Sequence, residues 1–113
     1  MKRGEVWVAN LNPNRGQEIG KVRPVLVIQD DRVIAAGIPT VLVLPLTTQV
    51  WQDYEPFRVT IKAREKLESD SQVVVEQVRT LDRNRFGEGP LTTLTSEELA
   101  EVELSLKEVL GLR

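Results

Sequence analysis

The feature that most constrains the fold of this chain is the length of the segments between its β-rich runs. Runs rich in valine, leucine and threonine recur along the sequence, and most of the connecting segments are too short to hold a crossover helix. The pattern therefore predicts a mainly antiparallel, strongly twisted sheet that forms a small barrel. Five to six strands are expected, at about 4–9, 23–29, 40–47, 57–61, 72–79 and 89–95.

The C-terminal segment has the pattern of a single amphipathic helix. Thr95 and Glu98 have the spacing of a capping box, and Gly111 suits a helix C-cap. The apolar residues that share one helical face are Leu99, Val102, Leu106 and Val109. We expect this face to close the barrel while the charged residues face solvent.

Three other segments carry local predictions. Residues 30–39 are expected to be a connector, and residues 81–86 a single helical turn. Pro45 has no backbone N–H, which favours an edge position or a bulge near the end of its strand. Residues 11–21 hold a proline, two glycines and two asparagines, so they are expected to form a long loop. Loops of this length in small domains are commonly functional or mobile.

Composition limits the chemistry that the chain can perform. Its 113 residues suit one domain, residues 1–113. There is no cysteine and no histidine, which argues against disulfide scaffolds, zinc ribbons, thiol catalysis and histidine acid–base catalysis. We expect no metal and no cofactor. No apolar run approaches the roughly 20 residues of a membrane helix, and the N-terminus lacks a signal-peptide core, so a cytoplasmic protein without a membrane partner is expected.

The charge distribution is uneven along the chain. The net charge of −2 argues at first against nucleic-acid binding. However, residues 1–85 carry 13 basic and 11 acidic residues, whereas residues 86–113 carry 2 basic and 6 acidic residues. The acidity is therefore concentrated at the C-terminal end, and a basic site elsewhere is compatible with the net charge.

Three polar clusters adjoin the most apolar strands, at residues 18–23, 46–49 and 75–80. Each has a purely structural explanation, because strand-end arginines usually face solvent and threonines suit strands. If the clusters converge, arginine, hydroxyl and amide groups would bind a phosphodiester and stabilise developing negative charge. Without a metal, the simplest nucleophile is the 2′-OH that RNA itself supplies. The clusters therefore favour RNA cleavage over DNA hydrolysis.

At these clusters the chain resembles the MazF/PemK-type toxins of bacterial type II toxin–antitoxin systems. The matching segments, in family order, are RGEVWVANLNPNRGQEIGKVRPVLVIQDD, PTVLVLPLTTQ, VVVEQVRTLDRNRF and LSLKEVLGL. The resemblance implies an SH3-like barrel of the CcdB/PemK type that forms a homodimer. It implies a sequence-specific, metal-independent endoribonuclease (an mRNA interferase) that cuts single-stranded RNA by 2′-OH attack, leaving a 2′,3′-cyclic phosphate and a 5′-OH. A cognate MazE-like antitoxin with an acidic C-terminal segment is expected to block it.

The resemblance also assigns roles to residues. Its catalytic groups fall on Arg23 of the R-P-V motif, on Thr47 rather than Thr48, and on Glu18 of the glycine-rich loop. Accounts of the family often assign the proton transfer to the arginine, here Arg23. A guanidinium keeps its proton near pH 7, so Glu18 is the better base on chemical grounds, and the choice between the two stays open. RNA contacts are expected at ten further positions: Asn12, Gln17, Lys21, Thr48, Gln49, Trp51, Glu76, Gln77, Arg79 and Thr80.

Several alternatives stay open. CcdB-type toxins share the barrel and poison DNA gyrase, although they lack the R-P-V and E-Q-V-R-T patterns of this chain. A catalytically inactive barrel could bind RNA without cutting it. Trp51 and Tyr54 could stack on bases or could equally pack on the rim of the barrel.

Overall fold

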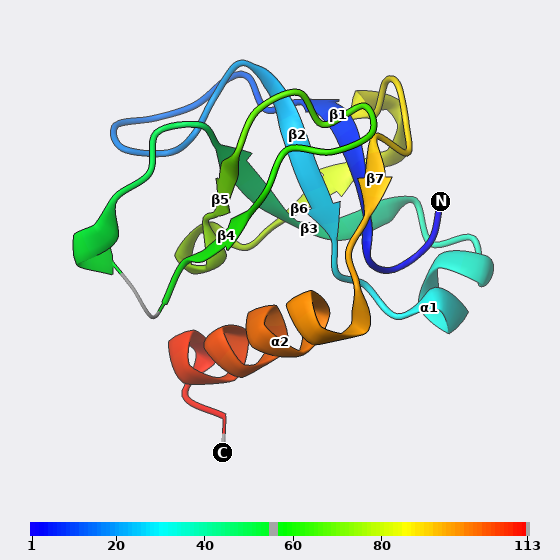
Figure 1. The fold of residues 1–113 in the computed structure, drawn as a ribbon. Helices are drawn as coiled ribbons and strands as arrows, with labels where there is room; N and C mark the ends of the chain where they lie inside the picture. The colour runs from blue at the N-terminus through cyan, green and yellow to red at the C-terminus, as the bar shows by residue number, and fades with distance from the viewer. Residues whose placement is uncertain (55–56, 113) are drawn as a thin grey trace.

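A curled antiparallel sheet with one long helix packed below it forms the body of the protein (Figure 1). The structure is a computed structural model that describes residues 1–54 and 57–112. The strands are β1 (Glu5–Asn10), β2 (Val22–Val27), β3 (Thr40–Thr47), β4 (Val59–Ile61), β5 (Ser71–Val73), β6 (Arg79–Asp82) and β7 (Thr92–Thr93). The helices are α1 (Asp31–Ala35) and α2 (Ser96–Leu110), with single 3₁₀ turns η1 (Gln52–Tyr54), η2 (Val75–Gln77) and η3 (Arg83–Arg85).

All strand pairs are antiparallel, in the order β4-β5-β3-β2-β1-β7, and β6 also pairs with β3. The predicted mainly β fold with a C-terminal helix is confirmed, and its strands form a half-barrel. The helical turn expected within 81–86 is confirmed as η3. The predicted connector at 30–39 contains a helix that was not expected, α1, where the Asp30 side chain accepts a hydrogen bond from the backbone N–H of Arg32.

The prediction of an edge position for Pro45 is wrong, because β3 lies inside the sheet. One edge of β3 pairs with β2, where Pro45 lies opposite Val25. Its other edge pairs with β6 over Thr40–Val43 and with β5 over Leu46–Thr47. Pro45 lies between these two stretches, and its carbonyl accepts a hydrogen bond from Val74 at 2.8 Å. The missing N–H therefore falls where β3 exchanges one neighbour for another.

The single strand predicted at 72–79 is also wrong. β5 ends at Val73, η2 turns the chain over Val75–Gln77, and β6 begins at Arg79. In the sequence, the apolar run Val73–Val75 suggests one continuous strand. In the structure all three valines are fully buried. Their burial instead reflects a turn that moves the chain from one part of β3 to another. This turn brings Glu76 and Gln77 out of a strand and onto the rim of the sheet.

Two apolar clusters occupy the two faces of the sheet. One includes Val6, Leu26, Leu44 and Leu46 and is covered by α2, whose Val102 is fully buried. Burial of one such side chain stabilises the fold by about 1.5–3 kcal/mol. The predicted capping box of Thr95 and Glu98 is present, and Gly111 ends the helix with φ of 72°. The other cluster contains Val25, Val27, Val41, Val43 and Leu81, with Ile19 packed against it. Among the described residues, no helix is long and apolar enough to cross a membrane.

Candidate active site

Two loops and η2 surround a pair of adjoining hollows at one end of the sheet. The first loop is residues 11–21, and the second loop is residues 48–58, of which 48–54 and 57–58 are described. The first hollow, about 420 Å³, is lined by Gln17, Ile19, Thr47, Gln49, Trp51, Tyr54, Arg58, Glu76 and Gln77. The second, about 470 Å³, is lined by Glu18, Glu76, Gln77, Val78, Arg79 and Thr80. The three polar clusters of the sequence therefore do meet.

Nine of the thirteen predicted site residues line one hollow or the other. The four that do not are Asn12, Lys21, Arg23 and Thr48. Asn12 and Lys21 form the neck of the first loop, where the Asn12 side-chain oxygen accepts the backbone N–H of Lys21 at 2.8 Å. Gly20 is packed tightly in this neck, because an added Cβ would lie 2.3 Å from the Asn14 side-chain oxygen.

Arg23 and Thr47 lie on neighbouring strands. Arg23 is opposite Ala9 on β1, and its Nε donates to the Gly20 carbonyl at 3.0 Å. The β2–β3 pairing ends at Val25 and Pro45, and if its register were extended by two residues Arg23 would come opposite Thr47. Residues that oppose each other point to the same face of a sheet. The half-buried Thr47 accepts the backbone N–H of Gln49 at 3.1 Å, which leaves its hydroxyl proton for donation, whereas Thr48 is exposed.

Glu18 lies on the exposed part of the first loop and is bonded within its own turn. Its carboxylate accepts the backbone N–H of Arg15 at 2.7 Å, and its carbonyl accepts a bond from Asn14 at 3.2 Å. Glu18 lines the second hollow, whereas Thr47 lines the first. For Glu18 to act on a substrate held at Thr47, this turn has to rearrange.

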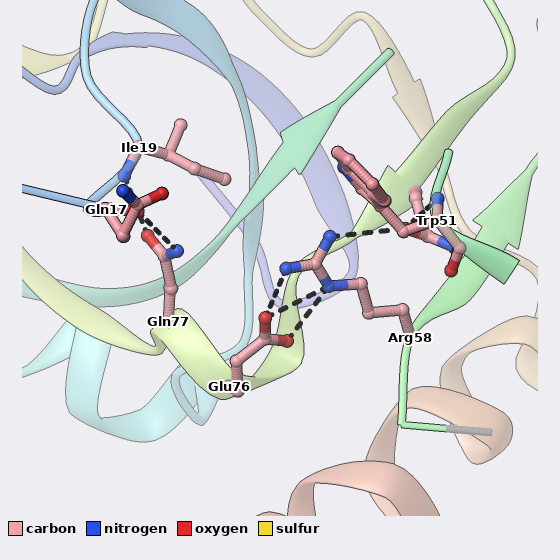
Figure 2. A network of polar contacts seen from close by, with 7 residues as sticks. Gln17, Ile19, Trp51, Arg58, Glu76 and Gln77 are labelled. Carbon is pink, nitrogen blue, oxygen red and sulfur yellow. Dashed lines mark hydrogen bonds and ion pairs between the residues drawn. The ribbon is translucent and has the colours of Figure 1, made fainter. Parts of the chain in front are cut away.

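Gln77 holds the first loop from below (Figure 2). Its side-chain oxygen accepts the backbone N–H of Ile19 at 2.7 Å, and its side-chain nitrogen donates to the carbonyl of Gln17 at 3.1 Å. These two bonds lie on either side of Glu18. Gln77 was predicted as an RNA contact, and in this structure both polar atoms of its side chain engage the first loop.

Gln72 holds the second loop in the same manner. Its side-chain oxygen accepts the backbone N–H of Trp51 at 3.2 Å, and its nitrogen donates to the Trp51 carbonyl at 3.2 Å. Gln72 is fully buried on β5. The Trp51 ring is left half-exposed, with its centroid 6.1 Å from that of Tyr54. The second loop thus presents an aromatic pair on a fixed backbone.

Arg58 connects the second loop to η2, and it was missed from the sequence. Its Nε lies 3.1 and 3.0 Å from the two carboxylate oxygens of Glu76, and its Nη2 also bonds to that carboxylate (Figure 2). The period-two pattern of residues 57–61 places Arg58 on the same side as the exposed Thr60, so it gave no signal of burial. Only its partner, 18 residues further along the chain, marks it as a site residue.

The charge state of Glu76 follows from this contact. Partial burial favours the protonated carboxyl, but the hydrogen bonds and positive charge of Arg58, with a backbone hydrogen bond, outweigh it and lower the pKa of Glu76. Glu76 is therefore an ionised hydrogen-bond acceptor at neutral pH. Arg79 lies beside it in the second hollow, opposite Val43, and its guanidinium reaches the Leu11 carbonyl at 3.4 Å. The exposed Thr80 follows.

This arrangement offers cationic, hydroxyl and amide groups around a hollow with an aromatic wall. Such groups can bind a phosphodiester and an unstacked base side by side. Among residues 1–54 and 57–112, histidine, cysteine, aspartate and glutamate form no group of three or more that could hold a metal ion.

Comparison with known proteins identifies the family. The profile described as PemK-like, MazF-like toxin of type II toxin–antitoxin system matches residues 2–110. The chain is 41% identical to endoribonuclease MazF of Staphylococcus saprophyticus, over 99% of this chain and 92% of that protein. MazF of Deinococcus radiodurans superposes with a TM-score of 0.81 at 27% identity, covering 99% of this chain and 97% of that one.

A second structural relative, from the MazE–MazF complex of Deinococcus radiodurans, has a TM-score of 0.75 at 26% identity. It covers 100% of this chain and 98% of that chain. Motifs, fold and full-length similarity agree, and the chain belongs to the family of PemK-like, MazF-like toxins of type II toxin–antitoxin systems.

Proposed function

We propose that this chain is an mRNA interferase that cleaves single-stranded RNA at a specific sequence without a metal ion. The observation that carries this proposal is that Thr47 lines a hollow together with Trp51 and Glu76, next to β2, the neighbouring strand that carries Arg23. A fixed cation and a hydroxyl donor on rigid strands suit a phosphate group, while the hollow suits a neighbouring base. The 41% identity to a protein named endoribonuclease MazF supports the same reaction class.

In the proposed reaction, the ribose 2′-OH attacks the adjacent phosphorus. The bond from phosphorus to the 2′-oxygen forms and the bond to the 5′-oxygen breaks, giving a 2′,3′-cyclic phosphate and a 5′-OH. Arg23 stabilises the extra negative charge on the phosphoryl oxygens, and Thr47 donates to a nonbridging oxygen. Glu18 accepts the 2′-OH proton once RNA has drawn the first loop inward, since a guanidinium keeps its proton near pH 7, and a water molecule gives a proton to the departing 5′-oxygen.

The remaining predicted contacts divide between the loops. Trp51 and Tyr54 stack on unpaired bases, and Gln49 and Thr48 bond to the RNA beside Thr47. Lys21 and Arg79 contact phosphates, and Asn12, Gln17 and Thr80 supply polar contacts along the strand. Glu76 acts as an acceptor for a base edge.

The proposed partners follow from the same site. A cognate antitoxin with an acidic C-terminal segment would compete with RNA for Arg23 and Arg79, and a relative from Deinococcus radiodurans is solved as a MazE–MazF complex. We further propose that residues 1–113 act as one domain, that the chain works as a homodimer, and that it acts in the cytoplasm, where mRNA is found.

The test is cleavage of a long single-stranded RNA in the presence of EDTA. We expect cuts at one short sequence, with new ends that polynucleotide kinase labels directly because they carry a 5′-OH. Arg23→Ala should fold but lose about 10²–10³-fold in rate, equivalent to roughly 3–4 kcal/mol of transition-state stabilisation. Arg32→Ala is the matched control, since Arg32 lies on α1 with a side chain that is 92% exposed. RNA binding without cleavage by the wild type would instead indicate an inactive barrel.

A further inference from the structure

Arg58 is the one charged residue that is buried among the described residues, with 9% of its surface exposed. It lies at the wall of the first hollow, directly before β4. A buried guanidinium is stable only when its N–H groups and its charge are compensated. The groups that compensate Arg58 therefore indicate its role in the site.

Each of the three guanidinium nitrogens of Arg58 already donates a hydrogen bond within the protein. Nε and Nη2 bond to the Glu76 carboxylate, and Nη1 lies 3.4 Å from the Gln72 side-chain oxygen. The Tyr54 ring lies 4.6 Å from the guanidinium carbon, which adds a cation–π contact. The Arg58 side chain is almost fully buried, which leaves little of the guanidinium accessible to a phosphate. The pair also carries no net charge, so this wall of the hollow does not attract a phosphate.

Glu76 is different, because it lines both hollows and its side chain is only partly buried. Its side chain is 39% exposed, compared with 8% for that of Arg58. Each carboxylate oxygen can accept more than one hydrogen bond, so the bonds from Arg58 leave acceptor capacity on the open side. An acceptor without a proton recognises a donor edge, which the exocyclic amino groups of adenine, cytosine and guanine supply, whereas the single N3–H of uracil lies between two carbonyl oxygens that repel a carboxylate.

Resting on the proposed function, we propose that Arg58 is a positioning residue that aims Glu76 at the exocyclic amino group of a substrate nucleobase. Arg58 itself does not touch RNA. It holds the carboxylate ionised and in one orientation, while Gln72 and Tyr54 hold Arg58. One position of the cleaved sequence is therefore restricted to an amino-bearing base.

The test deletes the amino group from each base of the substrate in turn. The substrate is a short RNA that contains the sequence cut fastest by the wild type, located by primer extension. Purine riboside replaces adenosine, inosine replaces guanosine, and pyrimidin-2-one riboside replaces cytidine. We expect a loss of at least tenfold in kcat/KM at one position. In Glu76→Gln and Arg58→Met, that penalty should fall below threefold. Arg58→Lys keeps the positive charge but loses the paired hydrogen bonds of the guanidinium, so it should give an intermediate penalty.

Arg64→Met is the matched control, because Arg64 makes the same kind of two-oxygen contact with Glu98 and neither residue lines the hollows. It should keep the full penalty. The proposal is overturned if no position shows a tenfold penalty, if Arg58→Met keeps the wild-type penalty, or if Arg64→Met loses it too. Should Arg58→Met fail to fold by circular dichroism, Glu76→Gln and Arg58→Lys decide under the same criteria. Absence of RNA cleavage by the wild type would contradict the proposed function instead.

Discussion

Each of the two loops that border the hollows is held by a glutamine side chain that bonds to its backbone, but the two glutamines differ in burial. Gln77 bonds to the backbone of the first loop at Gln17 and Ile19, and Gln72 bonds to the backbone of the second loop at Trp51. Gln72 is fully buried and is braced by Arg58, whereas Gln77 is half-buried on a 3₁₀ turn.

The difference suggests a division of labour. Opening free energies within a protein are lowest where backbone hydrogen bonds are exposed and few apolar contacts are buried. The first loop, which carries Glu18, can therefore be released from Gln77 at small cost. The backbone of Trp51 in the second loop is held more firmly, by the buried Gln72. In the proposed mechanism, base recognition would then rest on the firmly held Trp51 and proton transfer on the more easily released Glu18.

The largest effect should come from breaking the rigid clamp. Gln72→Leu keeps a similar volume but removes the oxygen that the backbone N–H of Trp51 and Nη1 of Arg58 donate to, whereas the Trp51 carbonyl keeps its bond from the Tyr54 N–H. Each buried group left unpaired costs about 1–3 kcal/mol, so we expect a loss of roughly 2–4 kcal/mol in the free energy of unfolding. Urea denaturation followed by circular dichroism measures it. A loss under 1 kcal/mol would show that the second loop does not depend on Gln72.

Removing the aromatic wall should reduce RNA affinity and leave stability nearly unchanged. The Trp51 ring is 47% exposed, so Trp51→Ala should cost less than about 0.5 kcal/mol in folding. A stacked base is worth about 1–3 kcal/mol, which predicts a loss of roughly 5- to 150-fold in affinity for a non-cleavable RNA with 2′-deoxyribose at the cut site. Fluorescence anisotropy measures it. Unchanged affinity together with lower stability would mean that Trp51 packs on the rim instead.

Breaking the weaker clamp should cost less. Gln77→Leu removes two partly exposed hydrogen bonds, and we expect a loss of about 0.5–1.5 kcal/mol in unfolding free energy. Backbone amides of residues 17–19 should exchange with deuterium faster, while those of residues 50–52 should not change. Equal acceleration in both loops would contradict their independence.

The smallest effect concerns pH. The folded state lowers the pKa of Glu76 below its ordinary 4.5, so its contribution to stability is present above that value and is lost as pH falls through the folded pKa. The free-energy difference between the wild type and Glu76→Gln should therefore shrink from pH 7 to pH 3. Since the Glu76 side chain is 39% exposed, solvent screening limits this change to about 0.5–1 kcal/mol.

Glu98→Gln provides a comparison for the pH series. The Arg64 hydrogen bond lowers the pKa of Glu98, so the change should have the same sign. A wild-type advantage at Glu76 that grows as the pH falls would contradict the direction of its pKa shift.

Some elements followed directly from the sequence, and others could not. The strand at 40–47 and the helix cap at Thr95 depend on local patterns, and both are present as predicted. η2 was read as strand because three consecutive buried valines look the same in a strand and in a turn that fills the core. Arg58 was missed because its burial depends on Glu76, which lies in a different cluster of the sequence. Local sequence patterns predicted the strands and the helix cap, but they could not predict polar pairs between residues far apart in the sequence.

The acidic helix α2 has a consequence for how RNA first meets the protein. α2 holds five glutamates and one lysine, and Glu97, Glu101 and Glu108 are exposed. It lies on the opposite side of the sheet from the first loop and from the start of β2, where Arg23 is found (Figure 1). A polyanion repelled at one pole and attracted at the other exerts a torque on the molecule during diffusional approach. The negative charge of α2 therefore favours an approach in which RNA meets the opposite side of the sheet.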